Sequence, residues 1–383
     1  MRFFSFIYVI ICLGGDSMLD IALKLLQEFT AKSYKAYIVG GFVRDHILGI
    51  ESNDIDITTN ATPKEIKELF VDSCLPNDDY GSVIVIKKGI RFDITTFREE
   101  KDYMDHRKPS VIQYIDDLYP DLLRRDFVIN TLCMDDKGEI IDYLGAQEDI
   151  NNRIIRTVGD AKQKFTDDSL RILRAIRFAT ILDFTLSPEV VDAIQETKSY
   201  VKELSNTRKK EELDKIFSSP NRDKGIQLLL QFGLDQELGL QHLKDVIGLD
   251  VTSSLDIWSL LDVADLYPFH KNELELMKNI RTAMDLNNLD PMALYQYGLY
   301  VNSCAGKMKG MDLKNITESY VNLVIHSRDE IDIDSETIMK VLDKKPGKYL
   351  KDIYDDIERE VLYRRLENNR EKIEEYILRK FKG

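Results

Sequence analysis

The chain has 383 residues, of which 43% are hydrophobic and 31% charged, and its formal net charge at pH 7 is −14. This composition is that of an ordinary soluble globular protein. The length exceeds one simple core, so we expect several domains. The negative charge argues against a general nucleic-acid coat protein but leaves room for a local basic groove. The four cysteines are scattered along the chain, at Cys12, Cys74, Cys133 and Cys304. This scatter favours free thiols in a reducing cytoplasm over a disulfide framework or zinc site.

The N-terminal residues 3–13 are almost all apolar and follow Arg2, a pattern similar to that of a short signal peptide. The segment is too short to predict a transmembrane helix, and we expect no membrane contact. An amphipathic helix begins at Met18, with apolar residues along one face. We therefore expect translation to start at Met18 and residues 1–17 to lie outside the fold, with secretion as the alternative. An intact mass that begins at Met1 would contradict this hypothesis.

A strand, a turn and a helix then precede two carboxylates. Residues 36–39 are apolar and end in Gly40-Gly41, whose turn would let backbone N–H groups face a phosphate at the start of a helix. Asp54 and Asp56 lie two apart among β-branched neighbours, so both project from one face of a strand. Adjacent carboxylates repel each other unless a cation lies between them, which indicates a divalent-metal site. A phosphate on one side and metal-binding carboxylates on the other favour phosphoryl or nucleotidyl transfer by two metal ions. Alone, each feature is also compatible with a solvated strand end or an ordinary turn.

The next segments predict a helix over 63–70, capped by Thr62, and a hairpin of strands 82–86 and 91–96. Asp93 lies in the second strand between apolar neighbours, where a charge is costly unless it is paired or metal-bound. A third carboxylate on a neighbouring strand is what a nucleotidyltransferase needs to activate an attacking hydroxyl. A strand edge that faces water is the alternative for Asp93.

Residues 97–120 are rich in charge and poor in periodicity, and we expect a long loop there. A loop of this length inside a compact domain is usually functional or disordered. The adjacent Arg124 and Arg125 follow, and then Asp126. These side chains are compatible with an exposed helix start. They are equally compatible with guanidinium groups on a triphosphate and a carboxylate on a ribose hydroxyl.

Five motifs occur in a fixed order along the chain. They are Gly40-Gly41-Phe42-Val43-Arg44-Asp45 with Asp54-Ile55-Asp56; Arg124-Arg125-Asp126-Phe127-Val128-Ile129-Asn130; Asp142 through Gly145 with Asp149 and Ile155-Arg156-Thr157-Val158-Gly159-Asp160; Asp168-Ser169-Leu170-Arg171 with Arg174-Ala175-Ile176-Arg177-Phe178; and Arg208 with Glu212. In order, they resemble motifs A to E of the class II tRNA nucleotidyltransferases, which are the CCA-adding enzymes and their poly(A) polymerase relatives. The resemblance runs from about residue 18 to the end and includes Lys345-Pro346-Gly347-Lys348 near the C-terminus.

The resemblance implies an enzyme that adds or repairs the 3′-terminal CCA of tRNA with CTP and ATP. It implies that Asp54 and Asp56 hold two Mg²⁺ ions and that Asp93 helps to activate the tRNA 3′-hydroxyl. The remaining implied residues are Gly40, Gly41 and Arg44 at the triphosphate; Arg125, Asp126 and Asn130 at the ribose; Asp168 and Arg171 at the base; Arg174, which orients its neighbours or meets phosphate; and Arg208 and Glu212 in support. Within the long loop, Arg98, Asp105 and Arg107 resemble a flexible segment of the members that add the terminal A.

Residues 164–181 predict one helix, on which Asp168 and Arg171 are surface neighbours. Cytosine and adenine both present an amino donor beside a ring-nitrogen acceptor. A carboxylate and a guanidinium together can therefore select them, whereas uracil and guanine leave both side chains unpaired. A salt bridge within the helix is the alternative for this pair, and a surface pair is the alternative for Arg208 and Glu212.

The sequence departs from the family pattern at four positions. Asp167 replaces the usual Glu before Asp168, Ser169 replaces a frequent Pro, Asp93 replaces a frequent Glu, and Thr207 replaces the Glu that opens motif E. The first three departures keep the carboxylate chemistry and the base-reading pair. Thr207 weakens the expected support from motif E.

We therefore expect an α+β fold. A small mixed-sheet nucleotidyltransferase head of polymerase-β type would span 18–142, followed by a helical neck at 143–222, a helical body at 223–310 and a helical tail at 311–383. The resemblance implies that body and tail hold the elbow and acceptor stem of tRNA through its backbone shape. The oligomeric state, monomer or homodimer, stays open. The rival functions are a relative that adds only CC, only A or poly(A), and a catalytically inactive RNA-binding module.

Overall fold

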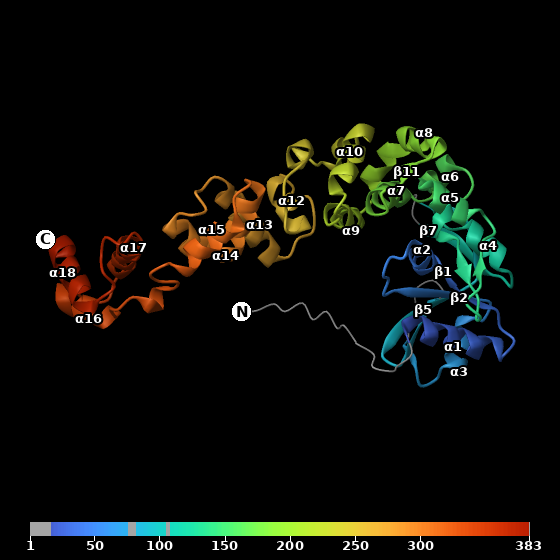
Figure 1. Cartoon of the computed structure of the whole chain (residues 1–383), viewed down its shortest axis with the longest axis horizontal. Coiled ribbons are helices and arrows are strands. Elements are labelled where there is room, and N and C mark those ends of the chain that lie inside the picture. Colours follow the sequence, from blue (N-terminus) through green and yellow to red (C-terminus); the bar gives the residue numbers. More distant parts are fainter. Residues whose placement is uncertain (1–16, 76–81, 105–107, 383) are drawn as a thin grey trace. The chain divides into compact units, whose positions relative to one another are not determined.

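The computed structural model describes residues 17–75, 82–104 and 108–382. The chain forms two compact units that divide after Leu238 (Figure 1). The predicted fold class is confirmed, because the first unit holds a mixed sheet and the described elements after Leu238 are all helices. Within the described ranges, every helix is too short or too polar to cross a membrane. Three of the predicted free thiols are confirmed, namely Cys74, Cys133 and Cys304. The fourth cysteine, Cys12, lies outside the described residues.

A seven-stranded mixed sheet forms the centre of the first unit, with the strand order β3-β4-β5-β2-β1-β8-β9. Its strands are β1 (Ala36–Val39), β2 (Ile55–Thr59), β3 (Cys74–Leu75), β4 (Ser82–Lys87), β5 (Ile90–Thr96), β8 (Cys133–Met134) and β9 (Ile140–Ile141). β2 and β5 run parallel, and the other neighbours in this sheet are antiparallel. The predicted hairpin is confirmed as β4 and β5. The parallel pairing of β2 with β5 brings two carboxylate-bearing strands side by side.

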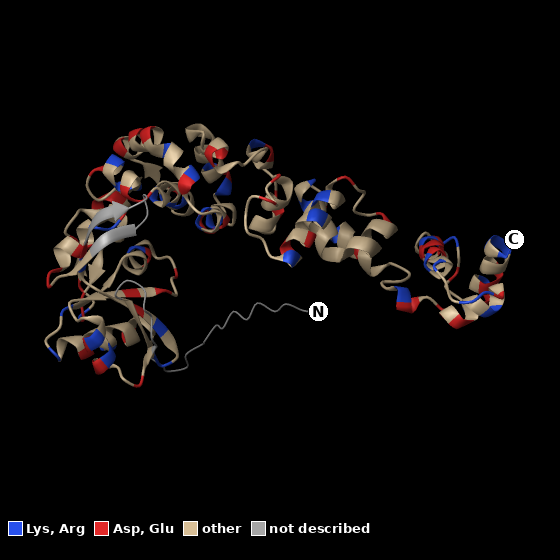
Figure 2. Cartoon of the chain, turned by 180° about the vertical axis from the view of Figure 1, so that it is seen from behind, with Lys and Arg blue, Asp and Glu red and all other residues tan. Residues whose placement is uncertain are grey.

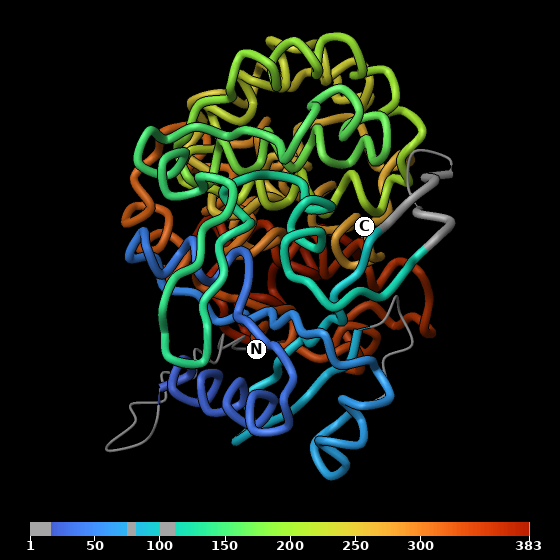
Figure 3. The backbone as a smooth tube through the Cα atoms, turned by 90° about the vertical axis from the view of Figure 1, so that its right-hand side faces the viewer, coloured from blue at the N-terminus to red at the C-terminus, as the bar shows by residue number. Residues whose placement is uncertain are grey.

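Helices lie at both ends of the unit that holds this sheet (Figure 1). α1 (Met18–Thr30) and α3 (Pro63–Leu69) begin at Ser17 and Thr62, whose hydroxyls cap the helix while an acidic side chain of the first turn reaches back. Both predicted helices are confirmed. Figures 1 and 3 show them at one end of the unit and the helices from α5 to α8 at the other. The other helices of this unit are α2 (Gly41–Leu48), α4 (Leu118–Leu123), η1 (Val128–Asn130), α5 (Ala146–Asn152), α6 (Ala161–Asp167), α7 (Leu170–Ile181), α8 (Pro188–Thr197), η2 (Lys198–Glu203), α9 (Asn206–Phe217), α10 (Arg222–Phe232) and α11 (Leu234–Leu238).

The long loop expected at residues 97–120 is wrong over most of its length. β6 (Arg98–Met104) and β7 (Lys108–Tyr114) pair as a separate antiparallel sheet, and α4 follows them. Charged residues fill the first of these strands without an apolar alternation, so periodicity gave no strand signal. Arg98 begins β6, whereas Asp105 and Arg107 lie outside the described residues. A second small sheet pairs β10 (Ile154–Ile155) with β11 (Thr185–Leu186) in parallel.

The single helix expected over residues 164–181 is also wrong, because the chain breaks between α6 and α7. Asp168 lies at the break with an extended backbone, at φ −144° and ψ 104°. Its carboxylate accepts the backbone N–H of Leu170 at 3.1 Å, which satisfies a donor at the start of α7. An Asp at this point therefore ends one helix and begins the next.

The second unit consists of helices after Leu238. They are η3 (Leu243–Val246), α12 (Ser254–Leu260), α13 (Lys271–Met284), α14 (Pro291–Met308), α15 (Leu313–Val321), η4 (Arg328–Glu330), α16 (Ser335–Leu342), α17 (Tyr349–Leu362) and α18 (Arg370–Phe381). Buried isoleucines of α16, α17 and α18 form one core. Figure 2 shows Lys and Arg interspersed with Asp and Glu along these helices. The unit boundary lies beyond the neck end expected at residue 222, because α10 packs on α7 and α9. The finer division into neck, body and tail stays a prediction.

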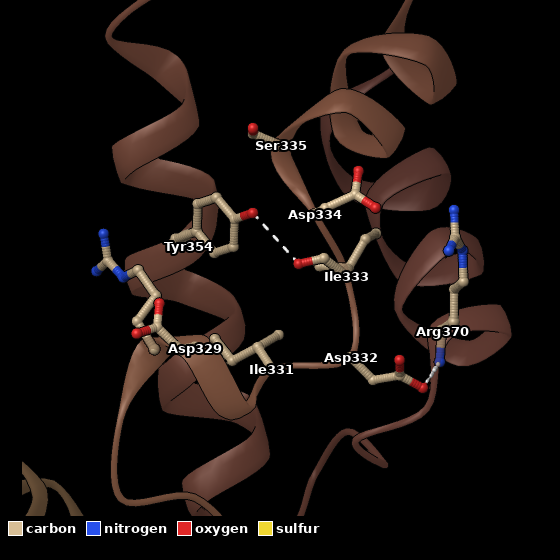
Figure 4. Close-up of a pocket in the computed structure, with 9 residues that line it drawn as sticks. Asp329, Ile331, Asp332, Ile333, Asp334, Ser335, Tyr354 and Arg370 are labelled. Carbon is tan, nitrogen blue, oxygen red and sulfur yellow. Dashed lines mark hydrogen bonds between the residues drawn. The ribbon is translucent and has the colours of Figure 1, made fainter.

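An open polar pocket of about 570 Å³ lies among η4, α16, α17 and α18 (Figure 4). The Tyr354 hydroxyl donates to the carbonyl of Ile333 at 3.3 Å, which joins α17 to the segment before α16. The two guanidinium groups of the lining, those of Arg328 and Arg370, are each paired with a glutamate. Their charge is therefore already neutralised within this unit.

Candidate active site

Three carboxylates meet at one end of the parallel pair β2–β5. Asp56 of β2 lies opposite Asp93 of β5, and Asp54 immediately precedes β2. One oxygen from each side chain lies within 4.8 Å of the others. Arg91 also reaches this cluster and pairs with Asp93 at 2.9 Å, although the Arg91 side chain is largely exposed. The arrangement offers a cation several hard oxygen ligands.

The Asp56 carboxylate has a strongly perturbed pKa. Its side chain opens to solvent, yet the surrounding protein removes enough water to disfavour the charged form. Together with the charge of Asp54, and in a smaller degree that of Asp93, this loss of water raises the pKa of Asp56 from 3.8 to about 6. The nearby charge of Arg125 opposes the shift. A divalent cation would remove the repulsion that these carboxylates impose on one another.

A pocket of about 360 Å³ opens beside the carboxylates. It brings together nine predicted site residues, namely Gly40, Gly41, Arg44, Asp54, Asp56, Arg125, Asp126, Asn130 and Arg174. Gly40 joins β1 to α2 with φ at +82°, a conformation that favours glycine. A Cβ atom at Gly40 would lie 3.5 Å from Nη1 of Arg125. The turn and this guanidinium therefore lie against each other at the wall of the pocket.

A chain of hydrogen bonds crosses the floor of the pocket. Arg44 Nη1 donates to Asn130 Oδ1 at 2.6 Å, and Asn130 Nδ2 donates to Asp126 Oδ1 at 3.2 Å. Arg174 Nε donates to the other oxygen of Asp126 at 2.7 Å. Burial alone would raise the pKa of Asp126, but Arg174, Asn130 and the Phe127 N–H hold it well below its usual range. Asp126 is therefore a fixed, ionised acceptor.

Arg177 and Phe178 line the same pocket, and neither was predicted as a site residue. The Phe178 ring lies 4.4 Å from the guanidinium carbon of Arg177, 5.2 Å from that of Arg44 and 5.5 Å from that of Arg174. Burial lowers the pKa of Arg177 to about 10, with Glu212 opposing this shift. The available signal was helical spacing, because residues three and four after Arg174 share its face.

The predicted base-reading pair lies outside the set of described residues that line this pocket. Asp168 accepts from Arg208 Nη2 at 3.1 Å, and the nearly buried Arg171 donates through Nη1 to the carbonyl of Lys164 at 3.0 Å. Both side chains therefore have protein partners in this structure. Asp168 is also held from two sides, by α7 and by α9.

Arg208 and Glu212 of α9 each contact the segment that carries the base-reading pair. Arg208 pairs with Asp168, and Glu212 pairs with Arg177 at 3.0 Å. The Arg177 and Glu212 side chains are only 11% and 5% exposed. The described contacts therefore agree with structural support of α7 by Arg208 and Glu212, and not with the alternative of a surface pair. The functional roles of both residues stay predictions.

Three family models match successive parts of the chain. Residues 36–156 match the poly A polymerase head domain, and residues 183–240 match the probable RNA- and SrmB-binding site of polymerase A. Residues 269–377 match tRNA nucleotidyltransferase domain 2.

Whole-chain relatives agree with these matches. The chain is 33% identical to the CCA-adding enzyme of Geobacillus sp. (strain WCH70), over 93% of this chain and 96% of that protein. It is 33% identical to the CCA-adding enzyme of Bacillus subtilis (strain 168), over 93% and 97%. The crystal structure of the Bacillus stearothermophilus CCA-adding enzyme in complex with CTP aligns with a TM-score of 0.85 and 27% identity, over 95% of this chain and 98% of that one. The chain therefore belongs to the CCA-adding enzyme family of tRNA nucleotidyltransferases.

Proposed function

We propose that this protein adds and repairs the 3′-terminal CCA of tRNA from CTP and ATP, in the cytoplasm. The observation that carries the proposal is the meeting of three carboxylates with an arginine-rich pocket at one end of the strand pair β2–β5. Carboxylates suit a metal-assisted transfer, and guanidinium groups suit a triphosphate. The names of the whole-chain relatives support the same reaction.

The carboxylate cluster supplies the hard oxygen ligands that Mg²⁺ prefers. Asp54 and Asp56 would hold two Mg²⁺ ions. When bound, such ions supply positive charge at the transferring phosphate and favour deprotonation of the attacking hydroxyl. Asp93 lies beside them, and its carboxylate would accept a hydrogen bond from the 3′-hydroxyl of tRNA, which makes this oxygen a better nucleophile.

The pocket residues would hold the rest of the nucleotide. Arg44 and Arg125 face the triphosphate together with the backbone of the Gly40-Gly41 turn. Asp126 and Asn130 accept from and donate to the ribose hydroxyls. The ionised state of Asp126, fixed by Arg174, favours this acceptor role.

The base would be read by Asp168 and Arg171, because the two incoming nucleotides share one donor–acceptor pattern. Arg208 holds the Asp168 carboxylate, and a base amino group would share that carboxylate with it. Arg98 stands at the start of the hairpin that would adjust the site for the terminal A. The tRNA acceptor stem and elbow would lie on the helical body and tail.

The test offers the purified protein three tRNAs, which lack the whole CCA end, end in its first C, or end in CC. Each nucleotide is supplied separately with Mg²⁺. We expect C to be added to the first two substrates and a single A to the third. Incorporation of U or G, or runs of A, would contradict full CCA addition and favour a relative with another specificity.

A matched pair of variants tests the metal assignment. The double variant Asp54→Ala, Asp56→Ala should lose incorporation entirely, because no carboxylate pair is left for the cation. The double variant Glu68→Ala, Asp72→Ala removes two exposed carboxylates of the same unit and should keep it. Extension of tRNA by the first variant would show that the metal assignment is wrong.

A further inference from the structure

Asp121 of α4 is a carboxylate behind the pocket wall that has no part in the reaction described above. Its side chain is completely buried, at 0% exposure. A buried carboxylate is costly unless charged and polar donors surround it. The donors around Asp121 come from three separate segments. One of these donors is Arg125, which lines the pocket.

The contacts of Asp121 use both of its oxygens. Oδ1 accepts from Arg124 Nε at 2.9 Å and from the backbone N–H of Arg98 at 3.2 Å. Oδ2 accepts from Arg125 Nη2 and from the Thr58 hydroxyl, each at 3.4 Å. One carboxylate thus joins the end of α4, the start of β6 and the middle of β2.

The contact with Thr58 places this junction on the strand that carries the catalytic carboxylate. Thr58 and Asp56 are two apart on β2, so their side chains project from the same face. Arg125 connects Asp121 to the pocket, because Arg125 lines the pocket and its Nη2 atom donates to Asp121. Its buried Nε has no hydrogen-bond partner among the described residues. A guanidinium group has five N–H donors, and Asp121 accepts only from Nη2 of Arg125.

We propose that Asp121 is a positioning residue that holds the Arg125 guanidinium toward the nucleotide triphosphate beside Asp56. The proposal rests on the proposed function. A guanidinium group fixed before the ligand arrives loses less side-chain freedom on binding, which strengthens its contact with phosphate. Because the contact is with phosphate and not with the base, Asp121 acts equally on CTP and ATP.

The experiment measures the binding of ATP and of CTP to the full chain by titration calorimetry, without tRNA. The proteins are the native chain, Asp121→Asn, Arg125→Ala and the double variant. We expect Asp121→Asn to raise both Kd values by the same factor, about tenfold, the loss of one charge-assisted contact. In the Arg125→Ala background the same change should raise Kd less than about twofold, because the two residues act as one unit.

Two results would overturn the proposal. The first is that Asp121→Asn leaves both Kd values unchanged. The second is that Asp121→Asn raises Kd by the same factor with and without the Arg125 side chain, which is the signature of a merely structural role. Failure of the native chain to bind either nucleotide would instead overturn the proposed function, and this proposal with it. Asp256→Asn is the control, because Asp256 is equally buried, lies in the second unit and accepts backbone N–H groups. It should leave both Kd values unchanged.

Asp121→Asn leaves Arg124 and Arg125 without their counter-charge and can lower the folding stability. Where thermal unfolding shows such a loss at the assay temperature, the variant Asp121→Asn, Arg124→Gln replaces the closest ion pair by two neutral amides. The same tenfold rise in Kd, removed by Arg125→Ala, is expected there. Native affinity in that variant would overturn the proposal as well.

Discussion

Asp56 lies directly opposite Asp93 where β2 and β5 pair in parallel, and both carboxylates approach Asp54 to within 4.8 Å. The two strands are separated in the chain by α3, β3 and β4, so only the folded sheet brings these charges together. Such proximity is unfavourable for the empty site and favourable for a cation-bound one.

The stability of the metal-free protein should depend on pH through Asp56. The pKa of this group is raised from 3.8 to about 6 by folding, so the folded state holds the proton more tightly than the unfolded state. Between these two values the folded state binds more protons, and stability falls as the pH rises. We expect the Tm of the native chain in EDTA, relative to that of Asp56→Asn, to fall from pH 4 to pH 6.5, as measured by scanning calorimetry.

The reference variant removes the titrating group but keeps its shape, so the difference in Tm isolates Asp56. Added Mg²⁺ at pH 7 should raise the Tm of the native chain more than that of Asp56→Asn. A Tm difference that stays constant with pH would contradict the raised pKa.

Asp168→Asn should change which nucleotide is accepted. An amide at this position keeps an oxygen that can accept the Leu170 N–H, but it presents a donor where cytosine and adenine also have one. We expect the kcat/KM for C addition to fall about 100-fold or more, and the preference for C over U to shrink. Single-nucleotide incorporation on tRNA that lacks CCA measures both quantities.

The same Asp→Asn change at the other end of α7 provides the control. Asp183 is an exposed residue that pairs with Lys224 at 2.7 Å. Asp183→Asn should keep the native nucleotide preference. An Asp168→Asn variant with the native preference would rule out base reading by this carboxylate.

The sequence was sufficient to predict features that depend on local chemistry. Thr62 and Glu65 predict the start of α3, because a capping residue and an acid three positions later satisfy the first N–H groups of a helix. The β-branched and apolar neighbours of Asp56 and Asp93 predict a strand at each position. The meeting of the two carboxylates depends on the parallel pairing of β2 with β5, which these local neighbours do not encode.

Features that depend on distant partners could not be predicted in this way. Asp121 has the appearance of an ordinary helix residue, because its partners at Thr58 and Arg98 lie far from it in the chain. The break at Asp168 was hidden because the apolar stripe continues across it and helical periodicity does not register a single extended residue. The strands β6 and β7 were hidden because pairing between backbones needs no apolar alternation.

Glu212→Gln should destabilise the first unit. The variant leaves the Arg177 guanidinium, which is 11% exposed, without its partner at 3.0 Å. Removing one member of a nearly buried ion pair costs about 3 kcal/mol, because a buried charge is left uncompensated. Denaturant unfolding at neutral pH measures this loss.

The matched change in an exposed pair is Glu68→Gln. Glu68 and Lys64 lie 3.8 Å apart with side chains that are 66% and 86% exposed. Such pairs contribute about 0.5 kcal/mol or less. Equal effects of Glu68→Gln and Glu212→Gln would show that the Arg177 pair is not truly desolvated.

Gly225→Ala should destabilise the first unit even though alanine is the better helix former by about 1 kcal/mol. Gly225 lies in α10 where this helix crosses α7 and α9, and a Cβ atom there would lie 2.5 Å from Thr180 Oγ1 and 2.6 Å from Ile216 Cγ2. The Thr180 hydroxyl cannot easily turn away, because it donates to the Ile176 carbonyl at 2.7 Å. The helices must therefore separate, at a cost of about 1–3 kcal/mol in the free energy of unfolding, which denaturant titration measures.

Gln227→Ala, on the exposed side of the same helix, should be neutral or slightly stabilising in the same denaturant titration. If Gly225→Ala matched it, the close approach of α10 to α7 and α9 would be contradicted.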